Sequence, residues 1–316
     1  MTLSPDTQAA LLLCGHFGAR KGPRPLGLRE YNLLATWLRR EGARPGDLLT
    51  GLAVPPDVAA PDRVRALLER GGGLAFTVEA WERRGIWVVG RADAAYPQRL
   101  RALGSRAPVL LYGAGDVALF GREAVGAVGS RDAAPESLHL ARQLGGACAS
   151  DGLAVVSGGA KGVDREAMLG ALDAGGVAVA FLAEGVAKPS VSKLWRRAVA
   201  GGRLALASAV VPEARWARAE ALGRNRLIHA QSEWSVVVES GTSGGTWEGA
   251  REALAGDLAP VLVHVGPGAG PGNRALVADG AAAVSLPSAI AESSVREALR
   301  EAVRAGAGQG SLFGSL

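Results

Sequence analysis

Three segments rich in glycine and serine separate apolar runs from helix-like runs in this chain. They are Gly129-Ser130-Arg131, residues 157–164 (SGGAKGVD) and residues 240–246 (SGTSGGT). Each follows a short apolar run typical of a buried strand and precedes a run with helical spacing. Small residues leave main-chain N–H groups accessible, and N–H groups at the start of a helix favour phosphate or carboxylate. The three segments therefore indicate an anion-binding site.

Basic side chains accompany these segments. Arg131 and Lys161 lie within the first two, and Gly223-Arg224-Asn225-Arg226 opens a further helix-like run, LIHAQ. Arginine presents forked N–H donors that match phosphate oxygens. A tight turn or a solvated helix face would explain any one of these segments, whereas their recurrence at several strand ends favours a shared site. The predicted site consists of Gly129, Ser130, Arg131, Ser157, Gly158, Lys161, Gly162, Arg224, Asn225, Arg226, Ser243 and Gly244.

Residues that could break bonds are few. The four histidines lie on different predicted elements without the spacing of a metal site: His16, His139, His229 and His264. Asp164 is expected to cap the helix that follows its glycine loop, and Glu239 to orient a loop. Neither G-x-G-x-x-G nor G-x-x-x-x-G-K-[ST] is present, which disfavours an ordinary dinucleotide site or a Walker-type NTPase. The sequence predicts a binding protein without catalytic residues, metal or cofactor.

The elements that must position these residues alternate along the chain. From residue 125 onward, Val/Ala/Leu runs alternate with helix-like runs, which predicts a doubly wound α/β fold with a mostly parallel, Rossmann-like sheet. Ligands bind such sheets outside the carboxyl ends of the strands, where the three segments lie. Residues up to 84 form short helix-like pieces between Pro and Gly breaks. We therefore expect a helical N-terminal module (1–84), a Rossmann-like domain carrying the site (85–305, with a final helix over 287–305) and a flexible tail (306–316).

Composition is compatible with several classes of ligand. The 316 residues are 48% hydrophobic and 21% charged, as in globular proteins. The net charge of +5 permits binding to nucleic acid without requiring it. Two cysteines without a CxxC motif argue against a disulfide framework and fit a reducing compartment. The absence of a signal-peptide pattern and of a long apolar stretch predicts a cytoplasmic protein that makes no membrane contact.

The motifs together resemble one family. GSR, SGGAKGVD, GRNRLIHAQS, VVVESGTSGGTWEGA and GPGAGPGNRALVADGA, preceded by DAAYPQRLRALGSRAPVLLYGAGD, resemble the DNA-processing protein A (DprA/Smf) family over about residues 85–284. The resemblance implies an extended Rossmann-like domain that binds single-stranded DNA, a homodimer, and assistance in loading RecA recombinase during natural transformation and recombination. It also implies that Arg131, Lys161, Arg224 and Arg226 form a basic DNA pocket, with the glycines and serines of the site as main-chain donors.

The chain departs from the family pattern in three places. SGGAKGVD replaces the usual SGLARGID, so that lysine stands for arginine and the bidentate fork is lost. SGTSGGTWEGA alters the usual SGSL-TA element, and no winged-helix module is expected after residue 305. Trp195, Trp216 and Trp247 lie near basic segments; base stacking is open to them, but burial is favoured.

Two other interpretations stay open. SGGTWE resembles the G-G-x-G-T-x-x-E motif of LOG-type phosphoribohydrolases, which suggests a nucleotide-binding sensor or a related protein. Glu248 follows Thr246 by two residues instead of three, so hydrolysis is disfavoured. The segment from Gln309 to Phe313 (QGSLF) resembles the peptide by which partners bind the bacterial replication clamp, and it suggests that clamp as a further partner.

Overall fold

The computed structural model describes residues 3–17 and 22–310. They form two compact units. The first contains the chain up to Ala114 together with Glu184–Val191 and Ala207–Arg215, and the second contains Gly115–Ala183, Ser192–Leu206 and the chain from Trp216 onward. The predicted segment from Gln309 to Phe313 extends past the described residues, which end at Gly310.

The first unit surrounds a buried helix. Helix α1 (Pro5–Cys14) is packed by α2 (Leu28–Arg40), α3 (Pro61–Leu68), α4 (Gly71–Glu82) and an antiparallel strand pair, β1 (Ile86–Gly90) and β2 (Leu110–Ala114). A short 3-10 helix, η1 (Pro45–Thr50), also packs on α1, and α5 (Gln98–Arg101) and η2 (Gly104–Arg106) lie between the strands. Leu11, Leu34 and Leu67 are fully buried in its core.

The division of the chain differs from the boundary predicted after residue 84. Both β1 and β2 belong to the first unit with the N-terminal helices. The Thr7 hydroxyl of α1 accepts a hydrogen bond of 2.9 Å from the Gly90 N–H at the end of β1. Contacts between a helix and a strand far apart in sequence therefore enlarge this unit beyond the helical segment.

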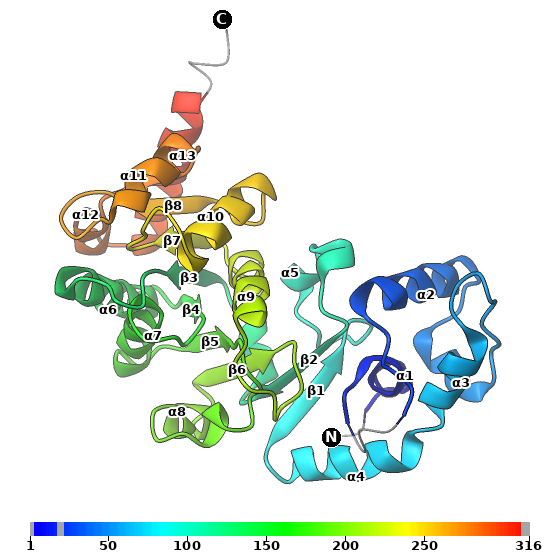
Figure 1. The fold of residues 1–316 in the computed structure, drawn as a ribbon. Coiled ribbons are helices and arrows are strands. Elements are labelled where there is room, and N and C mark those ends of the chain that lie inside the picture. The colour runs from blue at the N-terminus through cyan, green and yellow to red at the C-terminus, as the bar shows by residue number, and fades with distance from the viewer. Residues whose placement is uncertain (1–2, 18–21, 311–316) are drawn as a thin grey trace, which may run out of the picture. The chain divides into compact units, whose positions relative to one another are not determined.

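The second unit is built on a parallel sheet (Figure 1). The order is β6-β5-β4-β3-β7-β8-β9, and all the pairs from β5 to β9 are parallel. The sheet runs outward from β3 in both directions, so the order of strands reverses between β3 and β7. The bounds are β3 (Ala124–Val128), β4 (Ala154–Ser157), β5 (Ala178–Phe181), β6 (Leu204–Ser208, which begins in this unit), β7 (Trp234–Val237), β8 (Val261–His264) and β9 (Ala282–Val284).

Helices connect these strands and cover the sheet in two groups. One group contains α6 (Pro135–Ser150), α7 (Val163–Asp173), α12 (Leu286–Ala291) and α13 (Val295–Gly310). The other contains α9 (Arg218–Gln231), α10 (Gly245–Ala255) and α11 (Pro271–Ala278), while α8 (Arg196–Ala200) precedes β6. The doubly wound, mostly parallel α/β fold predicted from the sequence is confirmed. No helix in the described part of the chain has both the length and the apolar character needed to cross a membrane.

The C-terminal segment differs from the prediction of one helix followed by a flexible tail. Residues 287–305 contain parts of two helices, because α12 ends at Ala291 and α13 begins at Val295, where the Ser294 hydroxyl accepts a hydrogen bond from the Glu297 N–H. Asp151 holds this junction by accepting from the Ser294 hydroxyl and the Arg296 N–H, both at 2.9 Å. Helix α13 then continues to Gly310, with Gly306 packed against Ala282 of β9.

Helices α6 and α7 approach each other through glycine. A Cβ atom at Gly145 would lie 2.0 Å from the Ala167 carbonyl oxygen, and a Cβ atom at Gly170 would lie 2.0 Å from the Arg142 carbonyl oxygen. Backbone therefore packs directly on backbone at both positions. The neighbouring Gly146 faces open space, since nothing lies within 4 Å of a Cβ atom placed there.

We predict opposite effects for two adjacent substitutions in α6. Gly145→Ala should lower the free energy of unfolding by about 1–3 kcal/mol, because the added methyl group forces the two helices apart. Gly146→Ala should raise it by about 0.5–1 kcal/mol, because alanine favours the helix at a site with room. Urea denaturation of both variants checks the prediction. Equal stability of the two variants would contradict the close helix contact.

Candidate functional site

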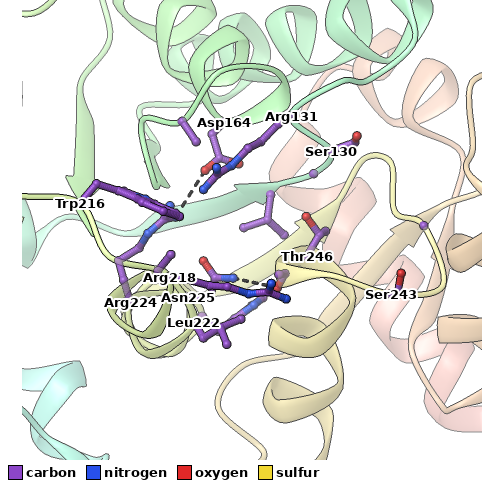
Figure 2. Close-up of a pocket in the computed structure, with 17 residues that line it drawn as sticks. Ser130, Arg131, Asp164, Trp216, Arg218, Leu222, Arg224, Asn225, Ser243 and Thr246 are labelled. Carbon is purple, nitrogen blue, oxygen red and sulfur yellow. Dashed lines mark hydrogen bonds and ion pairs between the residues drawn. The ribbon is translucent and has the colours of Figure 1, made fainter. Parts of the chain in front are cut away.

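A pocket of about 410 Å³ lies in the second unit, at the carboxyl ends of β3 and β7 where the strand order reverses. Loops that leave neighbouring strands in opposite directions open a crevice at such a position. Figure 2 shows its walls: the segments after β3 and β4 together with Trp216 on one side, α9 on another, and the segment that leads into α10 on a third. Six predicted site residues line it with their side chains or backbone: Gly129, Ser130, Arg131, Arg224, Asn225 and Ser243.

The glycines after β3 and β4 pack these two loops together. A Cβ atom at Gly129 would lie 2.5 Å from a Val163 methyl group. Gly162 has φ +93°, and a Cβ atom there would lie 2.3 Å from the Ser130 carbonyl oxygen. The left-handed backbone and the close approach both require glycine. Contact between the loops therefore accounts for these glycines, and the Val163 N–H donates to the Ser130 oxygen at 3.3 Å.

A buried ion pair joins α9 to the loop after β4. Arg224 Nη1 lies 3.4 Å from Asp164 Oδ2, and the two side chains are 7% and 8% exposed (Figure 2). Gly158 leaves room for the guanidinium, since a Cβ atom there would lie 1.5 Å from Nη1, and the Gly158 N–H donates to Asp164 Oδ2 at 3.1 Å. Burial raises the pKa of the Asp164 carboxyl and lowers the pKa of the Arg224 guanidinium, and the attraction within the pair opposes both shifts.

This arrangement corrects two predictions. Arg224 was expected to present its charge to a phosphate, but that charge is buried against a carboxylate because desolvation makes an unpaired guanidinium unfavourable there. Asp164 was expected to cap α7. Gly162 holds the N-cap position instead, and the Asp164 carboxylate turns back toward Arg224 and the Gly158 N–H.

The exposed charge of the pocket comes from Arg131 and Arg218. The Arg131 guanidinium carbon lies 5.5 Å from the centroid of the Trp216 ring, a cation–π distance, and Trp216 is 50% exposed. Neither arginine has an ion-pair partner among the described residues. Figure 2 shows Arg131 and Trp216 together at one wall and Arg218 beside Asn225 at another.

The sequence prediction did not include Arg218, and it named Trp216 only as one of three tryptophans that could stack on a base. Burial was the favoured expectation for all three tryptophans. It holds for Trp195, which is 5% exposed, but not for Trp216. Trp247 is half-buried. A signal was present: Arg215-Trp216-Ala217-Arg218 has arginines on both sides of the tryptophan and no apolar periodicity that would bury it.

The start of α10 supplies main-chain donors. The N–H groups of Gly245 and Thr246 belong to its first turn, which has no acceptors within the helix. The Asn225 side chain donates to the Gly245 carbonyl oxygen at 2.8 Å and so ties α9 to this turn. Ser243 and Thr246 add hydroxyl groups to the lining (Figure 2).

Several predicted donors are already engaged within the protein. The Ser130 N–H donates to the Glu239 carbonyl oxygen at 2.9 Å, and the buried Ser157 hydroxyl donates to the Ala127 carbonyl oxygen at 2.6 Å. As expected, Glu239 orients a loop, since its carboxylate accepts from the Ala134 N–H at 2.9 Å. Residues of all three predicted loops line the pocket, but several of their groups are bonded within the protein instead of facing it.

Two predicted basic residues lie outside the pocket lining. Lys161 is exposed and pairs with Asp132 at 3.0 Å, and Arg226 pairs with Glu252 at 2.5 Å. Gly158, Gly162 and Gly244 also lie outside the lining. Lys161 and its partner Asp132 are both more than two-thirds exposed, so water screens their attraction. Another anion can therefore easily replace Asp132 as the partner of Lys161.

A neutral histidine lies at the inner side of the pocket. His229 is 1% exposed, and its Nδ1 atom lies 2.6 Å from the Ser235 hydroxyl. Burial, and then the nearby Arg224 charge, lower the pKa of His229 to about 4. Asp164 is the one carboxylate among the lining residues that the structure describes, and it is paired. The open part of the pocket is therefore cationic.

Comparison with known proteins assigns the chain to a family. Residues 87–294 match the family described as DNA recombination-mediator protein A. A Mycobacterium tuberculosis protein named for DNA processing protein DprA is 35% identical over 243 residues, which cover 74% of this chain and 60% of that protein. The same match occurs in a second strain of that organism. The chain thus spans about 60% of the length of the curated relatives it matches.

Solved structures share the fold. DNA processing protein A from Streptococcus pneumoniae superposes with a TM-score of 0.69 at 21% identity, covering 92% of this chain and 99% of that one. DNA processing protein A from Helicobacter pylori, described for its single-stranded DNA binding mode, gives a TM-score of 0.55 at 22% identity over 65% and 94% of the two chains. The matched residues and the sequence identity show that the chain belongs to the DNA recombination-mediator protein A (DprA) family.

Proposed function

We propose that the pocket in the second unit binds single-stranded DNA and that the protein is a non-catalytic DNA-binding member of its family. The observation that carries this proposal is the exposed Arg131 guanidinium stacked on the half-exposed Trp216 ring, at the mouth of a pocket whose one carboxylate is buried and paired. A cation beside an aromatic face is suited to a strand that offers alternating phosphates and bases.

Each part of the pocket has a proposed role. Arg131 and Arg218 neutralise backbone phosphates, and the N–H groups at the start of α10 donate to phosphate oxygens. Trp216 stacks on a base, which requires no sequence preference. Arg224 and Asp164 hold α9 in place, while Lys161 and Arg226 contribute charge along the path of the strand outside the pocket.

The wider role is proposed from family membership and the sequence motifs. In this role the protein is a homodimer in the cytoplasm. It helps to load RecA recombinase onto single-stranded DNA during natural transformation or recombination. Within the chain, the second unit carries the proposed DNA site, and the first unit, which holds the N-terminal helices together with β1 and β2, is the other module.

A free nucleotide is the second candidate ligand. A volume of about 410 Å³ is in the range of small-ligand pockets, and the same cations and N–H groups suit a nucleotide phosphate. Thermal unfolding separates the two candidates. Stabilisation by oligothymidine at concentrations at which dTMP and ATP have no effect supports the DNA proposal, and the reverse pattern supports nucleotide sensing.

We predict that Arg131→Ala weakens binding of a labelled oligothymidine about tenfold, because hydrogen bonds to charged groups contribute about 1.5–3 kcal/mol. The slope of log affinity against log salt concentration should fall in magnitude by about one, because one phosphate contact is lost. Fluorescence anisotropy at several salt concentrations measures both quantities.

Arg122→Ala is the matched control for this measurement. Arg122 is exposed just before β3, at the opposite end of the strand that Arg131 follows, and it contacts the Gly152 carbonyl oxygen at 3.3 Å. Both variants remove one positive charge. If the two variants bind oligothymidine with the same affinity and salt slope, Arg131 is not a DNA contact.

We predict that Trp216→Ala weakens oligothymidine binding by about 1–3 kcal/mol, because a base loses its stacking partner. Trp216→Phe should retain much of the affinity, since phenylalanine keeps an aromatic face, and its salt slope should match that of the parent. Quenching of tryptophan fluorescence by the bound oligonucleotide in the parent, compared with Trp216→Phe, reports the contact directly. Quenching of the same size in both proteins would exclude stacking on Trp216.

A further inference from the structure

The first unit contains a second pocket, with a volume of about 610 Å³. Its lining comes from α2, from the segment that follows α2, and from the connection between β1 and β2 that includes α5. Four arginines line it: Arg39, Arg44, Arg91 and Arg101. No aspartate or glutamate of the described residues contributes to its lining.

Most of this positive charge is not neutralised within the protein. Arg91 donates to the Asn32 side-chain oxygen at 2.8 Å and to carbonyl oxygens after α5, and Arg101 donates to the Asp93 carbonyl oxygen. These acceptors are neutral. Arg39 is exposed on the last turn of α2 and has no ion-pair partner in the described part of the chain. Arg44 alone among the four is paired with a carboxylate, that of the buried Asp6.

Two of the arginines are held in fixed orientations. The Arg91 guanidinium carbon lies 5.6 Å from the Tyr31 ring centroid, and that of Arg101 lies 5.9 Å from the Tyr96 ring centroid. Hydrogen bonds and ring contacts restrict these side chains before any ligand arrives, so little side-chain entropy remains to be lost on binding. Small residues such as Ala35, Ala92 and Gly104 keep the space between them open.

We propose that this arginine pocket binds a phosphate group, supplied either by a nucleic-acid strand or by a free phosphate compound. Several guanidinium groups without carboxylate partners favour a multiply charged oxyanion over a single carboxylate. The volume leaves room for the sugar or base attached to a phosphate. The proposal goes beyond the function proposed for the second unit, because it concerns another pocket and does not require the Trp216 site to bind DNA.

Arg39→Glu in the full chain tests the proposal, with Arg40→Glu as the matched control. Both residues are exposed on the last turn of α2, and Arg40 does not line the pocket. The two variants carry the same change in charge. We expect Arg39→Glu to bind a labelled oligothymidine roughly tenfold more weakly than Arg40→Glu at low salt, because one charged phosphate contact becomes repulsive. Equal melting temperatures without ligand will show that both variants are folded. If Arg39→Glu does not fold, Arg39→Gln, which only removes the charge, takes its place.

Two further arms identify the source of the phosphate. The first arm uses inorganic pyrophosphate. If Arg39→Glu and Arg40→Glu bind oligothymidine equally well, but pyrophosphate raises the melting temperature of Arg40→Glu alone, the pocket binds a free phosphate compound. If Arg39→Glu weakens oligothymidine binding in the Arg131→Ala background as well, the strand contacts this pocket independently of the first site. Equal oligothymidine affinity and equal response to pyrophosphate in Arg39→Glu and Arg40→Glu would overturn the proposal. That result would leave the DNA site of the second unit untouched, since Arg131→Ala tests that site separately.

Discussion

The site of the second unit depends on one buried ion pair, between Arg224 of α9 and Asp164 of α7. Removing two charges from water is costly, so each side chain is stable in its place only because the other is there. The absence of a side chain at Gly158 allows the contact, and the Gly158 N–H adds a hydrogen bond to the same carboxylate. The pair thereby fixes α9 beside the loop after β4. The pocket is shaped before any ligand enters it, and its exposed charge comes from other arginines.

The position of the pocket follows from the topology of the sheet. Chain segments leave β3 and β7 in opposite directions, and the crevice between them is lined by the residues that begin α10 and by those that follow β3. Small residues at this place serve two purposes. Gly129 and Gly162 bring two loops into contact, whereas Gly245 and Thr246 present N–H groups that have no acceptor within their own helix.

Much of this architecture could be predicted from local pattern. Alternating apolar and helical runs specify a parallel sheet, and the motifs after β3, β4 and β7 specify where a ligand would lie. The failures have a common physical cause, which is that the deciding partner is distant in sequence. Arg224 is separated from Asp164 by 60 residues, so the burial of its charge is invisible in the motif RNR. The same holds for β1 and β2, which join the first unit through contacts with α1, and for the start of α13, where Ser294 donates a hydrogen bond to the distant Asp151. Burial was expected for Trp216 because tryptophan is usually buried, whereas the fold leaves half of its surface exposed.

The glycine contacts between α6 and α7 affect the ligand site through rigidity. These helices begin directly after the loops that carry Arg131 and Lys161, and their backbones touch at Gly145 and Gly170 without intervening side chains. Interlocked main chains cannot slide past one another without losing that fit, so the two loops form a single stiff rim. Any adjustment to the proposed DNA strand must then come from the opposite rim, where α9 and α10 are joined by the hydrogen bond from the Asn225 amide to Gly245 and by the Arg226–Glu252 ion pair.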